Sequence, residues 1–189
     1  MENHMKQRIQ NRIIEAAIVK LASKPVSTLD EIAKAADVGR ATLYRHFDSR
    51  TALIKAMIKY ADQKMDEAIC SIFTSKMPAE QKLDELVRAL IPLGASLHFT
   101  VYEPIHGNDP EVTKGHKKFL DWFKGLCQEL KDEGVAAQDI PVAWVVANLD
   151  MIIFTAWEKI KSGDIAANDA PNLVLRTFLN GIGTAGSQQ

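Results

Sequence analysis

The chain has 189 residues, of which 47% are hydrophobic and 25% charged, and its formal net charge at pH 7 is −1. This composition excludes an intrinsically disordered chain, and the length allows a small headpiece plus a larger core, or one mid-sized domain. The two cysteines, Cys70 and Cys127, lack the spacing of a metal site or a disulfide framework, so we expect reduced thiols in a cytoplasmic protein.

The first predicted helix spans residues 6–22, with Ile9, Ile13, Ala17 and Leu21 on one face. The residues before it are polar and lack the apolar core of a signal peptide. Proline in the loop 23–27 ends the helix, because proline cannot continue it.

Residues 28–47 read as two short helices joined by a tight turn. Thr28 can cap the first of them, and Glu31, three residues later, completes a capping box. An apolar stripe at helical spacing follows, and the helix stops at residues 37–39, where Gly39 can adopt the backbone conformation that a tight turn needs. A helix, a glycine-containing turn and a second helix form a helix-turn-helix arrangement.

The second short helix, residues 40–47, has two distinct faces. Leu43 and Phe47 lie four residues apart and face inward, which leaves a polar outer face made of Arg40, Thr42, Tyr44, Arg45 and His46. The alternative interpretation is an ordinary helical hairpin with a solvated face. The exposed aromatic Tyr44 and the lack of any acid in these residues favour a surface that meets phosphates.

Positive charge is concentrated around this motif. Residues 1–50 contain nine lysines and arginines against six acids, a balance of +3, whereas residues 51–189 contain 14 against 18, a balance of −4. An acidic remainder would keep the rest of the molecule away from DNA.

The remainder of the chain predicts further helices over residues 49–74, 79–96, 110–133, 139–162 and 168–183, with an irregular stretch over 98–109 and no segment of strand alternation. Gly134 would stop one of these helices, and Pro141 and Pro171 fall in the first turns of the last two. The fold class is therefore all-α.

The helix over residues 141–161 is apolar on nearly every side and must be buried. It contains the longest apolar run, residues 142–157, which Asn148 and Asp150 interrupt and which is too short to span a bilayer. Burial by a second copy of the protein, together with the final helix, is our preferred interpretation. The alternative is that both helices complete the core of a monomer.

Residues 12–54 resemble the DNA-binding domain of the TetR family of bacterial transcriptional regulators. The matching stretches are RIIEAAIVKLA, TLDEIAKAADV and GRATLYRHFDSRTAL, and the run from Leu43 to Phe47 matches the family's most specific signature. The resemblance implies a helix-turn-helix DNA-binding domain over residues 1–50 and a helical effector-binding and dimerisation domain over residues 51–189. It also implies a homodimer joined by its last two helices, which represses from a double-stranded, palindromic operator until a small-molecule effector releases it.

Side-chain chemistry suggests how DNA would be read. The planar guanidinium of Arg40 matches the two acceptors of guanine, and Thr42 can touch a base edge or a thymine methyl. Arg45 could read a base or bind phosphate. Thr28 lies where a helix N-terminus would meet the DNA backbone.

The resemblance implies phosphate contacts for Tyr44 and His46, and it places Arg50 where the family usually has a phosphate-binding lysine. The chain departs from the family pattern here and at two other positions. Gly39 replaces a capping serine, and Ala41 replaces a common glycine, adding a methyl group where the helix backbone would approach the bases.

The resemblance also implies an effector pocket among the later helices. Large apolar side chains with a few polar groups are typical of such sites, although ordinary core packing explains any single one equally well. The candidate lining residues are Met65, Ile69, Phe73, Leu86, Phe99, Tyr102, Trp122, Phe123, Leu126, Trp144, Asn148 and Met151. The scarcity of cationic side chains favours a neutral or cationic, aromatic or lipophilic ligand.

Other chemistry receives little support. A loose group of possible metal ligands fits no recognised metal-site spacing; it comprises His98, Glu103, His106, Asp109, Glu111 and His116. We expect no metal, no cofactor and no enzymatic activity. The alternatives are an enzyme, for which Asp150 with His98 or His106 is the only acid–base pair we can propose, and a helical small-molecule-binding protein that does not read DNA.

Overall fold

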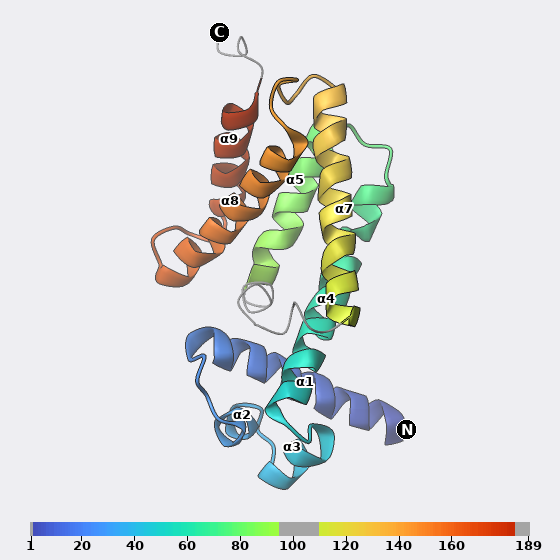
Figure 1. Ribbon diagram of the computed structural model, residues 1–189. Helices are drawn as coiled ribbons and strands as arrows, with labels where there is room; N and C mark the ends of the chain where they lie inside the picture. Colours follow the sequence, from blue (N-terminus) through green and yellow to red (C-terminus); the bar gives the residue numbers. More distant parts are fainter. Residues whose placement is uncertain (1, 95–109, 184–189) are drawn as a thin grey trace. The chain divides into compact units, whose positions relative to one another are not determined.

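A computed structural model of the protein describes the backbone of residues 2–94 and 110–183, and their side chains except those of residues 2–3 and 111–116. Within these ranges the chain is helical apart from short connections and one antiparallel bridge between Ala136 and Gly183 (Figure 1). The predicted all-α class is therefore confirmed. None of the helices described has the length and apolar character needed to cross a membrane.

The helices follow one another in the order α1 Glu2–Ser23, α2 Leu29–Ala35, α3 Arg40–His46, α4 Arg50–Thr74, α5 Ala79–Leu90, a 3₁₀ turn η1 Ile91–Leu93, α7 Pro110–Asp132, α8 Val142–Ser162 and α9 Ala170–Ile182. Residue contacts divide them into two compact units, and the division along α4 falls after Lys64. The predicted domain boundary after residue 50 lies at the start of α4 and stays a prediction.

The first unit is built from α1, α2, α3 and the first half of α4. Its core consists of buried apolar side chains, of which Ile13, Ile32, Leu43, Leu53 and Met57 are completely inaccessible to solvent. Each of these four helices contributes at least one of them. Because α2 and α3 are too short to be stable alone, this shared core is what holds them in place.

The second unit contains the end of α4, α5, η1, α7 from Lys114 onward, α8 and α9. Contacts between α8 and α9 and between α5 and α9 form its centre. The Lys82 ammonium pairs with Glu129 at 2.8 Å, and the Glu133 carboxylate accepts a hydrogen bond from the Ala79 N–H at 2.9 Å. These two contacts tie α5 to α7 and satisfy an N–H group that the start of a helix leaves unpaired.

Some predicted boundaries were wrong. The helix expected over residues 79–96 ends at Leu90 and continues as η1, because Pro92 interrupts the helical hydrogen bonds. Pro141 precedes α8 as its N-cap instead of lying in its first turn. Gly134 does stop α7, with a left-handed φ of 75°. The irregular stretch predicted over residues 98–109 lies outside the described residues.

Candidate nucleic-acid interface

The start of α2 is fixed by a capping box, as the sequence predicted. The Thr28 hydroxyl accepts a hydrogen bond from the Glu31 N–H at 3.2 Å, and Glu31 in turn accepts from the Thr28 N–H at 2.7 Å. A hydrogen bond from Lys24, followed by the one from the Thr28 N–H, lowers the pKa of Glu31 to about 2. Glu31 therefore stays ionised, and the polar groups of Thr28 are already engaged within the protein.

The turn between α2 and α3 differs from the prediction. Gly39 has an extended conformation with φ −67° and ψ 148°, and the left-handed residue is Asp37, with φ 52°. Aspartate tolerates this region better than most residues because its short polar side chain can bond locally. The Arg12 guanidinium donates to the Asp37 carbonyl at 3.1 Å and so ties the turn to α1.

Helix α3 shows the two faces that its sequence predicts. Leu43 is fully buried and Phe47, the residue after the helix, is 3% exposed. The outer side carries the predicted DNA-contacting residues, of which Arg40, Ala41, Tyr44 and Arg45 are exposed and Thr42 and His46 half-buried. Gly39 caps the helix without any side-chain hydrogen bond, as expected from the absence of serine.

His46 lies at the less exposed edge of this face. Partial burial lowers its pKa from the ordinary value near 6.5, and the positive charges of Arg45 and Lys6 lower it further. The Lys6 contribution shows that the first turns of α1 add positive potential beside α3. Lys6 is part of α1 in this structure, as the predicted helix over residues 6–22 implied.

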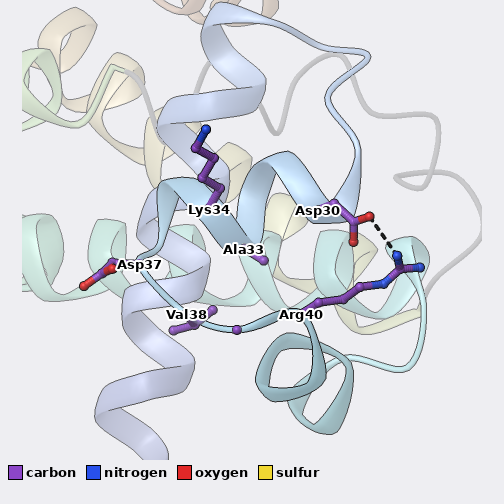
Figure 2. Close-up of a pocket in the computed structure, with 7 residues that line it drawn as sticks. Asp30, Ala33, Lys34, Asp37, Val38 and Arg40 are labelled. Atoms are coloured by element: carbon purple, nitrogen blue, oxygen red, sulfur yellow. Dashed lines mark ion pairs between the residues drawn. The ribbon is translucent and has the colours of Figure 1, made fainter.

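Arg40 is held by two neighbours, which the sequence did not reveal. Its guanidinium pairs with the Asp30 carboxylate of α2 at 3.0 Å (Figure 2), and it lies over the Tyr44 ring, 5.4 Å from the ring centre. The pair borders an open hollow between α2 and the start of α3, whose other lining residues are Ala33, Lys34, Asp37, Val38 and Gly39. Asp30 lies on α2, outside residues 40–47, whose lack of acids had indicated a surface that meets phosphates.

Arg50 also has protein partners. Its guanidinium donates to the main-chain carbonyls of Ser27 and, at 2.8 Å, of Pro25. The arginine at this position thus connects the start of α4 to the loop before α2. Its predicted phosphate contact stays a prediction, since a guanidinium has five N–H donors and two are used here.

The candidate effector-binding residues of the second unit fall into separate groups. Ile69, Leu86, Phe123 and Leu126 are buried, and Met65 is half-buried. Phe73 and Trp122 are half-buried and stack with ring centres 5.1 Å apart. Phe99 and Tyr102 lie outside the described residues.

The three candidates on α8 do not line the interior. Trp144 is 64% exposed and Met151 57% exposed, and Asn148 is exposed between them. In this protomer the opposite face of α8, with Val145 and Leu149, packs into the core. The effector-binding role of the three residues stays a prediction. Both faces are apolar, so the sequence pattern could not distinguish the inner face from the outer one.

The loose group of possible metal ligands, which we expect to bind no metal, lies where the structure does not describe side chains. His98, Glu103, His106 and Asp109 lie outside the described residues, and the side chains of Glu111 and His116 are not described. Among the side chains that are described, no group of three histidines, cysteines or acids could hold a metal ion.

The proteins that this chain resembles are bacterial transcriptional regulators. A family model described as "Bacterial regulatory proteins, tetR family" matches residues 13–57. The transcriptional repressor LfrR of Mycolicibacterium smegmatis is 32% identical over 163 residues, which cover 86% of this chain and 85% of LfrR. The transcriptional regulator NfxB of Pseudomonas aeruginosa is 21% identical, covering 90% of this chain and 92% of NfxB.

Solved structures share the fold. The structure of LfrR from Mycobacterium smegmatis in complex with proflavine superposes with a TM-score of 0.80 at 24% identity, covering 95% of this chain and 99% of the other. The structure of AibR in complex with isovaleryl coenzyme A and operator DNA gives a TM-score of 0.75 at 15% identity, with 89% and 97% covered.

Proposed function

The chain belongs to the TetR family of bacterial transcriptional regulators, and from this premise we propose that it is a homodimeric repressor that a small molecule releases from an approximately palindromic operator. The observation that carries the DNA-binding part is the structure of α3, where exposed cationic and aromatic side chains lie on one side and Leu43 and Phe47 anchor the other. We propose regulation without catalytic turnover.

The recognition helix of a helix-turn-helix protein enters the major groove with its first residues closest to the bases. Arg40 and Thr42 occupy those positions and are the proposed base readers. Tyr44, Arg45 and His46 follow on the same outer face, where phosphates would flank the groove. In a dimer complex the two half-sites would lie about one helical turn, roughly 34–36 Å, apart.

Dimerisation is proposed through α8 and α9. A protomer with Trp144 and Met151 exposed on one helix leaves an apolar surface that a second copy could bury. The need for two half-sites supports the same arrangement, because a single headpiece contacts too few base pairs for useful specificity.

For the effector we propose a planar aromatic cation or a related lipophilic molecule. The relative LfrR has been solved with proflavine, which is such a cation. In this chain the Lys118 ammonium lies 4.5 Å from the centre of the Trp122 ring and pairs with Asp66 at 2.7 Å. An indole and a carboxylate that already hold one cation have the chemistry that a cationic aromatic ligand requires.

The test is selection of bound fragments from the host genome by the full-length protein, followed by competition at moderate salt. We expect retention of a small set of fragments with inverted half-sites, and their release by added proflavine. Binding that random DNA competes away equally well would contradict the proposed operator. Specific binding that proflavine leaves unchanged would contradict the proposed effector class alone.

A further inference from the structure

Neither folding stability nor general DNA affinity explains the ion pair between Asp30 and Arg40. The two side chains are 53% and 68% exposed, and exposed ion pairs contribute little to folding. A carboxylate on a surface that faces phosphates also opposes binding to any DNA sequence. Asp30 lies in the first turn of α2, where an acid interacts favourably with the helix dipole, but Glu31 already supplies that charge together with the capping box.

We propose that Asp30 is a positioning residue that orients Arg40 toward a guanine and keeps it from binding the nearest phosphate. This inference rests on the proposed function. The carboxylate holds one end of the guanidinium and the Tyr44 ring lies under it, as Figure 2 shows for the ion pair. A guanidinium fixed in this way retains donors for the two guanine acceptors and loses less conformational freedom when it binds them.

The second effect of Asp30 is to disfavour the wrong contact. A free arginine at the edge of the major groove can reach the DNA backbone, and phosphate contacts carry no sequence information. With its charge balanced by Asp30, Arg40 gains less from a phosphate and relatively more from the base. Asp30 therefore weakens binding to DNA in general but increases the difference in affinity between the operator and other sequences. A group that repels the wrong contact improves specificity in this way.

The experiment compares full-length Asp30→Asn with a matched control, Asp37→Asn. Asp37 borders the same hollow but points away from Arg40 (Figure 2), and asparagine tolerates its left-handed φ. Both changes remove one negative charge and alter no volume. Affinity is measured for the selected operator and for random DNA over a range of salt concentrations, and base preferences are measured by selection from a randomised half-site.

We expect Asp30→Asn alone to reduce preference at one base position, the position that Arg40→Ala also relaxes, by about three- to tenfold, a part of what an arginine–guanine pair supplies. We also expect its salt slope on random DNA to steepen by about one unit, because Arg40 then captures a phosphate. Asp30→Glu should restore the preference. In an Arg40→Ala background, Asp30→Asn should cause no further loss of preference.

Two outcomes would overturn the inference, and they can be distinguished. Identical base preferences and salt slopes for Asp30→Asn and Asp37→Asn would show that Asp30 acts only through its charge or the helix dipole, and would leave the proposed function intact. A wild-type protein with no base preference at all would overturn the proposed function, and this inference with it.

Discussion

Arg50 at the start of α4 and Ser27 in the loop before α2 are joined by a hydrogen bond from the guanidinium to the Ser27 carbonyl. A second N–H of the same guanidinium reaches the Pro25 carbonyl at 2.8 Å. Ser27 is completely buried, and its hydroxyl donates to the Lys24 carbonyl at 2.8 Å. The arginine thus closes a loop whose shape determines where α2 begins, and through α2 it supports the position of α3.

Arg50→Ala is expected to loosen this loop and to weaken binding of all DNA sequences alike. Hydrogen bonds from a charged group contribute about 1.5–3 kcal/mol, so amides in the loop and α2 should exchange hydrogen faster by a measurable factor. Arg50→Lys keeps the charge but cannot bridge two carbonyls in the same way, and it should remain destabilised. If amide exchange is unchanged in Arg50→Ala and the salt dependence of its DNA affinity falls by about one unit, Arg50 binds a phosphate and does not support the loop.

Gly39→Ser is expected to stabilise the first unit. The backbone at residue 39 is extended, as an N-cap requires, and a Cβ there would meet nothing closer than the Thr42 hydroxyl at 4.0 Å. A serine hydroxyl could accept from an unpaired N–H in the first turn of α3, which is worth a few tenths of a kcal/mol up to about 1 kcal/mol relative to glycine. Chemical denaturation measures the gain, and Gly39→Ala is the control. If serine and alanine behave alike, the cap does not form.

DNA binding is expected to strengthen as the pH falls below neutrality, because of His46. Burial, Arg45 and Lys6 lower its pKa in the free protein, so the imidazole is neutral at pH 7 and a phosphate would raise its pKa on binding. Binding then takes up a proton, and affinity for DNA should rise by at most about tenfold for each unit by which the pH falls. The free energy of unfolding should decrease as the pH falls below about 6.5, because the unfolded chain binds the proton more tightly than the folded one. Titration of DNA at constant ionic strength tests this, and His46→Gln should remove most of the dependence.

Local patterns in the sequence predicted the parts of this structure that depend on neighbouring residues. The capping box of Thr28 and Glu31 and the inward-facing Leu43 are examples, since helical spacing and cap chemistry specify them directly. The prediction that Gly39 supplies the special conformation of the turn was wrong. Glycine permits a left-handed conformation without requiring it, and here Asp37 adopts that conformation instead. The pairing of Arg40 with Asp30 depends on how two helices pack and on side-chain rotamers, which no residue spacing contains.

The sequence of α8 likewise did not show which face of the helix is buried, because apolar residues lie on both faces. Trp144, Asn148, Met151 and Thr155 share one exposed face of a helix whose other face is buried. The Asn148 amide donates to the Trp144 carbonyl and the Thr155 hydroxyl to the Met151 carbonyl, each at 2.8 Å. The Thr155 hydroxyl and one N–H of Asn148 are thereby satisfied within the helix, which lowers the cost of covering this face.

Trp144→Glu or Met151→Glu is therefore expected to shift the protein from dimer to monomer. A charge placed in the apolar centre of an interface loses its hydration without gaining a partner, and disruption at such a position costs about 2 kcal/mol or more, roughly thirtyfold in the dissociation constant. Sedimentation over a range of concentrations measures the change. Val19→Glu is the matched control, because Val19 is an equally exposed apolar residue, 65% accessible, on α1. An unaltered dimer in both α8 variants would place the interface elsewhere, and a wild-type monomer at micromolar concentration would contradict dimerisation itself.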